Sequence, residues 1–511
     1  MASEGIRVVR DLRRARRRHA YREIDWTDAL YRVYLTAFLS VGAVSVLSGW
    51  VGGRFVTPEE LDSVIDRGPA VVGLAVALAL AVGLRSGGRG GPLVLQPADV
   101  AHLLMAPVPR GAVLRGPAAR QLRFRCFVGA VAGMVIGNLA ARRLPGGYAE
   151  WVAWGGAAGA IAGLAFTASA LVASGLRAGR RVAALLALLT VGWSVADLIL
   201  GLATSPATYL GRLANSPLDR LGAPGVGLVL LLLPAVGLAA VGGTSLEAAR
   251  RQAGLLAQLR FALTLQDVRT VILLRRQLAA EGPRRRPWFR LPPGSRRPVW
   301  RRDWQGVLRW PAVRLARLVA LGVVAGLAAS GAWRGTPALV VVAAAALLVA
   351  ALEAVEGLAQ EADHPVRLDT LPVRSGRLVV RHLAVPFVVT LVVVTVAVGA
   401  ALVSDGSRTV LTVGAVMVVP ASLAAVAGAA LSVQTDPVDP LLVLEPLGAT
   451  RLLVRAAAPT VLAVAAVLPV LSGRAALDAG LAPEAGAGIA AAAVLLAATA
   501  AVAWLRRAGT A

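Results

Sequence analysis

Residues 301–333 read RRDWQGVLRWPAVRLARLVALGVVAGLAASGAW, and an Asp-Trp pair stands directly before a long apolar run. The same order occurs near the start of the chain, before the apolar run of residues 31–51. The longer matches are Asp25-Trp26-x-x-Ala29-Leu30-x-Arg32 and Asp303-Trp304-x-x-Val307-Leu308-Arg309, offset by 278 residues (303 − 25). This recurrence indicates that one unit occurs twice.

A second motif recurs after each Asp-Trp pair. Gln96-x-Ala98-Asp99 and Pro107-Val108-x-x-Gly111 match Gln360-x-Ala362-Asp363 and Pro372-Val373-x-x-Gly376, with offsets of 264 (360 − 96) and 265 (372 − 107). The offsets of the two motifs differ by 13 or 14 residues because the loop after the first apolar run is shorter in the second half. It spans about 17 residues at 52–68 and three at 334–336. The halves therefore share one order of parts.

The composition places both halves in a membrane. Hydrophobic residues make up 57% of the 511 residues, against about 45–50% in soluble domains. Apolar stretches long enough to span a bilayer recur along the whole chain. We expect an all-α polytopic membrane protein of about twelve transmembrane helices, arranged as two parallel six-helix repeats because six is an even number. The predicted spans are 31–51, 69–84, 126–141, 152–174, 182–203, 224–243, 318–333, 337–352, 384–403, 410–432, 457–472 and 488–505.

The charges predict the orientation of these spans. The net charge is +25, and 44 of the 53 basic residues, all arginine, fall in the segments placed inside, against nine outside. This distribution follows the positive-inside rule and predicts a plasma-membrane protein with both termini in the cytoplasm. The positive-inside rule also accounts for the high positive charge. Binding to nucleic acid is therefore not needed to explain it, and we expect no nucleic-acid partner. No signal peptide is expected, since about thirty polar residues precede the first apolar run.

Four segments follow from this topology. Residues 1–30 form a basic cytoplasmic helix, which either lies along the membrane surface or is solvated and only sets the topology. Residues 31–245 and 301–511 form the two six-helix halves. Residues 246–300 form an Arg- and Pro-rich cytoplasmic linker. The linker offers a docking surface for a cytoplasmic partner or an attraction to anionic membrane lipids, and lipid contact is the more economical interpretation.

The chain is poor in residues that catalyse reactions. It contains no lysine, so a phosphate-binding loop of the G-x-x-x-x-G-K-[ST] type is excluded. None of the four histidines has a metal-ligand spacing to another, and no catalytic motif occurs. We therefore expect no enzyme activity, no metal site and no cofactor in this chain.

Asp197 is the clearest ionisable residue within a predicted span, and a carboxylate in hydrocarbon is a functional candidate by default. Its place about six residues from the outer end of the span favours a structural role over a proton relay. Arg317, Glu353 and Glu356 lie near span ends, where long side chains reach the membrane surface.

The cytoplasmic segments 92–115 and 358–381 are the strongest functional candidates. In the first, Asp99 is expected to cap a short helix that ends before the prolines. A short helix across the cytoplasmic face at the same place in both halves suits a mechanical coupling element, with Leu104 and Pro107 at the surface. The alternative is a re-entry turn that only orients the third span. The candidate residues are Asp99, Leu103, Leu104, Pro107, Val108 and Arg110, with Asp363, Leu371, Pro372, Val373 and Arg374 in the second half.

This layout resembles the permease subunits of ABC exporters of the ABC-2 type, and the fused permease-like membrane proteins of actinobacteria. The stretch Leu103-Leu104-Met105-Ala106-Pro107-Val108-Pro109-Arg110 is similar to the L-L-x-x-P-[VI]-[ST]-R stretch of those subunits, with Pro109 where Ser or Thr is usual. The resemblance implies an interfacial elbow helix before six spans. It also implies a coupling helix after the second span that meets a separate ATPase subunit, which binds the ATP.

Two other functions stay open at this point. A secondary transporter of the major-facilitator layout also has six plus six spans, but residues 83–89 lack the aspartate of its G-x-x-x-D-R-x-G-R-R pattern. The third possibility is a membrane scaffold that binds partners without transport. The few ionisable residues within the spans favour a hydrophobic or lipid-like substrate over a charged solute.

Overall fold

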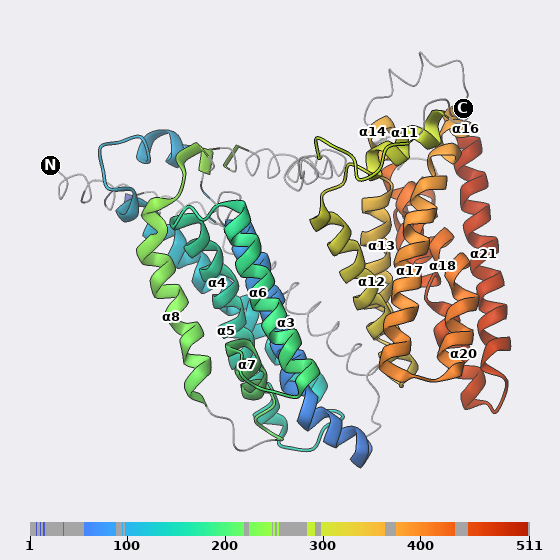
Figure 1. Ribbon diagram of the computed structural model, residues 1–511, viewed down its shortest axis with the longest axis horizontal. Helices are drawn as coiled ribbons and strands as arrows, with labels where there is room; N and C mark the ends of the chain where they lie inside the picture. Colours follow the sequence, from blue (N-terminus) through green and yellow to red (C-terminus); the bar gives the residue numbers. More distant parts are fainter. Residues whose placement is uncertain are drawn as a thin grey trace. The chain divides into compact units, whose positions relative to one another are not determined.

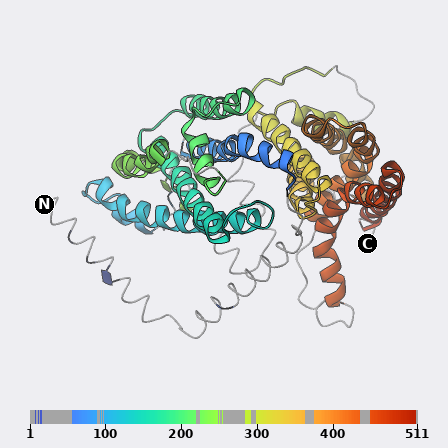
Figure 2. The same ribbon diagram turned by 90° about the horizontal axis from the view of Figure 1, so that it is seen from below.

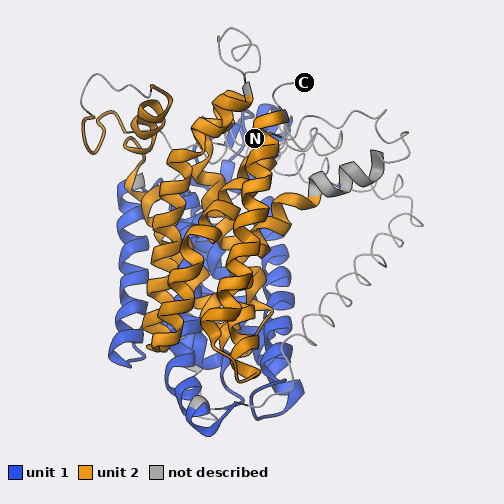
Figure 3. Ribbon diagram, turned by 90° about the vertical axis from the view of Figure 1, so that its right-hand side faces the viewer, with its two compact units in different colours: residues 1–266 blue, residues 267–511 orange. Residues whose placement is uncertain are grey.

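The computed structural model divides into two compact units, residues 1–266 and 267–511 (Figure 3). It describes residues 56–87, 98–218, 224–247, 284–291, 298–362, 375–434 and 448–508, and positions 7, 11, 14, 15, 34, 93, 95, 249, 250, 253 and 254. The boundary between the units falls inside the predicted linker 246–300. All regular elements within the described residues are helical, which confirms the all-α fold class.

Unit 1 is a bundle of long helices (Figure 1). Its elements are α3 (Pro58–Gly87), η1 (Asp99–Leu103), α4 (Arg110–Ala140), α5 (Tyr148–Gly175), α6 (Arg180–Leu200), α7 (Pro206–Ala214), α8 (Pro224–Ala240) and η2 (Val241–Gly243). The predicted span 126–141 is only the C-terminal half of α4, since this helix already begins at Arg110. The predicted span 31–51 lies outside the described residues apart from Tyr34.

The backbones of α4 and α5 approach each other very closely at a series of glycines. A methyl group built on Gly133 would lie 2.0 Å from the carbonyl oxygen of Gly155, and one on Gly159 would lie 2.2 Å from that of Gly129. Helices in a membrane associate through such small residues, because lipid tails provide no hydrophobic drive between them. The contact repeats every four residues, and its members are Gly129, Gly133 and Gly137 on α4 with Gly155, Gly159 and Gly163 on α5.

The connection between α6 and α8 contains a buried helix that the sequence analysis missed. Helix α7 packs against α3, and its Leu210 is fully buried. A methyl group on Gly211 would lie 1.9 Å from the carbonyl oxygen of Pro69, and one on Gly73 would lie 2.5 Å from Cα of Thr208. The predicted outer loop is therefore partly an element of the core.

Unit 2 is a second bundle. Its elements are α11 (Pro298–Val307), α12 (Ala312–Trp333), α13 (Leu339–Ala354), α14 (Glu356–Ala362), α16 (Ser375–His382), α17 (Ala384–Asp405), α18 (Arg408–Val433), α19 (Gly448–Ala465), α20 (Leu468–Asp478) and α21 (Pro483–Ala508). Within this unit, α11, α14 and α16 lie at one end of the long helices, and α20 lies toward the other (Figure 1).

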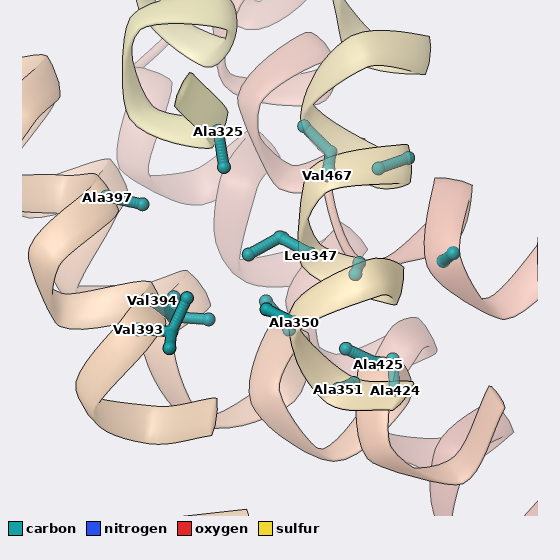
Figure 4. Close-up of a cluster of buried hydrophobic side chains, with 14 of the residues drawn as sticks. Ala325, Leu347, Ala350, Ala351, Val393, Val394, Ala397, Ala424, Ala425 and Val467 are labelled. Atoms are coloured by element: carbon teal, nitrogen blue, oxygen red, sulfur yellow. The ribbon is translucent and has the colours of Figure 1, made fainter. Parts of the chain in front are cut away.

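The core of unit 2 consists of small and branched apolar side chains. Figure 4 shows Ala325, Leu347 and Val394 on three different helices, with Val467 from the break between α19 and α20, around a common interior. Helix α18 is the most buried of the long helices, and its segment 420–430 carries an almost continuous run of buried residues. Alanine and glycine at these positions let neighbouring backbones approach closely.

Two apolar segments of unit 2 are bent. The axis turns by 62° between α13 and α14, and by 45° between α19 and α20. The predicted span 457–472 is therefore not one straight helix, since it contains the break at Ala466 and Val467.

Eight described helices are long and apolar enough to cross a membrane, and ten if each bent pair counts as one span. Large apolar side chains such as Phe127, Ile136 and Leu496 point outward from the bundles, where lipid tails surround them. The helices of each unit are seen from below in Figure 2. The chain is accordingly a multi-pass membrane protein.

Candidate functional site

The first coupling segment folds against one end of the unit 1 bundle. Helix η1 is a single π-helical turn whose Val100 is buried, and Leu104 follows it, also buried. Both side chains belong to one core cluster with Val113 of α4, Leu171 of α5 and Val241 of η2. Side chains from three other elements of the bundle thus hold the segment in place.

The opposite side of this segment is open. Ala101 and His102 are exposed, and Met105 is 69% exposed. Pro107 is exposed as expected, whereas the prediction that Leu104 lies at the surface is wrong. The spacing of apolar residues did not show which of two neighbouring leucines faces the bundle.

The remaining predicted residues of this segment take intermediate positions. Leu103 and Val108 are half-buried and pack against the same core cluster. Asp99 is the first residue of η1, and Ala98 occupies the capping position, so the predicted cap is wrong by one residue. The carbonyl of Asp99 accepts a hydrogen bond from the Leu104 amide at 3.2 Å. Arg110 begins α4 and is exposed.

The second coupling segment is described only at its borders. Asp363, Leu371, Pro372, Val373 and Arg374 lie outside the described residues. Helix α14 precedes them and α16 follows them, and the contacts of these two helices define how the segment is attached to unit 2.

Ion pairs attach α14 and the end of α13 to the neighbouring helices. Arg314 of α12 bonds Glu356 of α14, and Arg302 of α11 bonds Glu361 of α14. Arg317 donates two bonds to Glu353, at 2.5 and 2.9 Å. The sequence places Arg317, Glu353 and Glu356 near span ends, and in the structure Arg317 pairs with Glu353 while Glu356 pairs with Arg314. Pairing compensates part of the cost of placing these charges near hydrocarbon.

The aspartate of the second Asp-Trp pair has a partner on α16. The carboxylate of Asp303 accepts a hydrogen bond from Nδ1 of His382 at 2.8 Å, and both side chains are buried. Nδ1 is the donor, because an ionised carboxylate only accepts. Asp303 also lies against Gly357, where a methyl group would stand 3.0 Å from its oxygen. The motif thus joins α11 to both borders of the second coupling segment.

The matched glycines of the two coupling motifs each lie beside the backbone of a segment that comes later in their unit. A methyl group on Gly111 would lie 3.7 Å from Gly242, just beyond α8. One on Gly376 would lie 2.1 Å from the carbonyl oxygen of Arg506, near the end of α21. The offsets are 265 (376 − 111) and 264 (506 − 242). The helix that carries the matched glycine therefore starts close to a later segment of the same unit, η2 in unit 1 and the end of α21 in unit 2.

Asp197 is a structural acceptor at the turn between α6 and α7. Its carboxylate is buried and accepts from the amide and the hydroxyl of Thr204, and from the amide of Ser205 at 2.8 Å. Trp193 donates to the same Thr204 hydroxyl at 2.8 Å. Ser205 itself caps α7 by accepting from the amide of Thr208. This bonding fixes the entry into the buried helix.

A cavity lies in unit 2 between α12, α13, α17 and α18, at the end opposite the ion pairs. The cavity is small, with about 40 Å³ open to the centre of a water-sized sphere. Its walls are alanine, valine, glycine, leucine, methionine and tryptophan, with Ser330 as the polar member. The hydroxyl of Ser330 already donates to Ser404 at 3.2 Å. The cavity therefore suits a hydrocarbon group better than a polar one.

Within the described parts of the chain, no group of three or more His, Cys, Asp or Glu residues is arranged to hold a metal ion. Comparison of the chain with protein-family models, curated proteins and solved structures gave no match.

Proposed function

We propose that this protein is the membrane-spanning permease of an ABC-type exporter and is powered by a separate ATPase subunit. In this proposal the chain comprises two parallel six-helix repeats with twelve spans, and both ends lie in the cytoplasm. The ATPase binds the cytoplasmic segments 92–115 and 358–381, and its ATP cycle moves the two halves against each other.

The structure of η1 carries the proposal. A coupling element needs one face that a partner can touch and another that passes force to the spans. Met105 and His102 are open to a partner, and Val100 and Leu104 share a core with α4, α5 and η2. Because such cores are close-packed, a push on η1 moves the attached helices.

The neighbours of Gly111 and Gly376 support the repeat. Gly111 lies near η2 and Gly376 lies near the end of α21, and the offsets between these positions match those of the second sequence motif. A repeat of the whole six-helix half explains why residues far apart in each half keep one spacing. It also places a coupling segment at the same end of each unit.

The surroundings of Asp197 argue against proton-coupled transport. A proton relay needs a carboxylate that is free to gain and lose its proton. Asp197 is instead held by amide and hydroxyl donors in the turn that carries α7. The substrate we favour is hydrophobic, in keeping with the apolar cavity of unit 2.

Crosslinking tests the proposed partner. Met105→Cys is made in a Cys126→Ser background, and the chain is produced together with an ABC-type ATPase subunit. Met105→Cys should crosslink to the ATPase. Leu481→Cys should not, although this residue is 64% exposed, because it lies at the α20–α21 turn.

Uncoupling provides the second test. Leu104→Ala should leave the complex assembled but lower the amount of substrate transported per ATP hydrolysed. The reason is that the segment of η1 then loses its packing contacts with α4, α5 and η2. Transport driven by a proton gradient in purified protein without any ATPase, and abolished by Asp197→Asn, would exclude the proposal in favour of a secondary transporter.

A further inference from the structure

Residues 284–291 of the linker lie shortly before α11 and are held on the chain that joins α11 to α12. The amide of Arg284 donates to the carbonyl of Arg309 at 2.8 Å, and the amide of Trp288 donates to that of Leu308 at 2.9 Å. The indole of Trp288 donates to the carbonyl of Trp310 at 2.9 Å. The guanidinium of Arg284 stacks 3.6 Å above the ring of Trp288. The segment is thus a defined part of unit 2.

This segment presents aromatic and basic side chains outward. Phe289 is 74% exposed and Trp288 is 42% exposed. Arg285, Arg286 and Arg290 are exposed as well, and none of them forms an ion pair with a residue that the structure describes. Two large aromatic side chains are therefore exposed directly beside arginines that have no described acidic partner.

The acidic side chains of α11 and α14 are engaged with other residues. Asp303 bonds His382, and Glu361 bonds Arg302. Neither carboxylate is therefore available to neutralise the arginines of residues 284–291. Arg285, Arg286 and Arg290 therefore keep their positive charge on the outward side of the segment, where an anion from outside the protein can bind.

The position of the segment fits the surface of the membrane. The span of α12 begins at Ala312, directly after the chain on which residues 284–291 are held. Figure 3 shows α11 and the loop before it standing out beside the upper end of the unit 2 helices. Aromatic side chains at the end of a span settle at the level of the lipid headgroups.

We propose that residues 284–291 form a binding site for the headgroups of anionic phospholipids. Arg285, Arg286 and Arg290 bind lipid phosphates, whose oxygens match the fork of guanidinium donors. Phe289 and Trp288 enter the boundary between headgroups and acyl chains. Arginines that only set the topology would not require the three hydrogen bonds that fix residues 284–291 to the chain between α11 and α12. The site does not depend on the proposed transport function.

A spin label at position 289 tests the site in the full chain. The variant Cys126→Ser, Phe289→Cys carries a nitroxide and is placed in nanodiscs with or without phosphatidylglycerol, the remaining lipid being phosphatidylcholine. Collisions with oxygen and with a water-soluble nickel complex report the depth of the label. We expect the label at the headgroup–acyl boundary in discs with phosphatidylglycerol, and in water in phosphatidylcholine alone.

Matched pairs of arginines provide the control. Arg285→Gln, Arg286→Gln should shift the ratio of membrane-bound to free label toward the free state by about 30-fold, which corresponds to about 1 kcal/mol for each arginine. Arg506→Gln, Arg507→Gln removes the same charge from exposed positions at the end of α21 and should leave the ratio unchanged. A label in water in both discs, or equally deep in both, would overturn the proposal.

Discussion

Asp303 of α11 and His382 of α16 are 79 residues apart in sequence, and their side chains form a buried hydrogen bond of 2.8 Å. The aspartate belongs to the motif that recurs near the start of the chain. Its bond attaches the helix before the first span of unit 2 to the helix that precedes α17. The second copy of the Asp-Trp motif thus has a defined structural role, because its aspartate binds His382.

Asp303→Ala should lower the stability of the purified protein by about 1–3 kcal/mol, because Nδ1 of His382 is left buried without an acceptor. The measurement is the thermal unfolding midpoint in detergent. His382→Ala should have a similar effect, and the double variant should cost less than the sum of both. Strictly additive effects would show that the two side chains do not interact.

Gly133→Ala should destabilise unit 1 by about 1–3 kcal/mol, because the new methyl group would overlap the carbonyl of Gly155 and force α4 and α5 apart. Gly192→Ala is the matched control, since a methyl group there meets no atom within 4 Å. Thermal unfolding of the two variants compares them directly. Equal midpoints would contradict the close α4–α5 contact.

Asp197→Asn should lower the unfolding midpoint while leaving transport little changed. The amide group replaces one acceptor oxygen and faces the donors of Thr204 and Ser205, at a cost of about 1–3 kcal/mol. Asp478→Asn is the control, because this aspartate is largely exposed and pairs only with Arg474 one turn away. A loss of transport without any loss of stability would assign Asp197 a functional role instead.

Reporter fusions test the predicted topology. Fusions after Pro217 and Ala485 should report the outer side, and fusions after Gln252 and Ala511 should report the cytoplasm. The reason is the enrichment of arginine in the segments placed inside. Opposite locations for Gln252 and Ala511 would show that the second half does not contain an even number of spans.

The location of most long helices could be predicted from the sequence. The predicted spans 152–174 and 410–432 are α5 (Tyr148–Gly175) and α18 (Arg408–Val433). This agreement has a simple cause. An apolar run of about twenty residues in a bilayer must satisfy its own backbone hydrogen bonds, and a helix does this locally.

The candidate site could be predicted only in part, because burial depends on contacts between residues that are far apart in the sequence. The sequence marked residues 92–115 as a cytoplasmic segment with apolar anchors. It did not show that Leu104 is buried while Met105 is open, because that choice depends on contacts with Leu171 and Val241.

The sequence by itself therefore determined an all-helical membrane protein, since composition and local hydrogen bonding decide where apolar helices form. Only the tertiary structure decided the buried helix α7, the close packing of α4 on α5, and the pairing of Arg317 with Glu353. Those features join residues tens of positions apart. They depend on which helix faces meet, and the order of residues within one helix does not specify its neighbour.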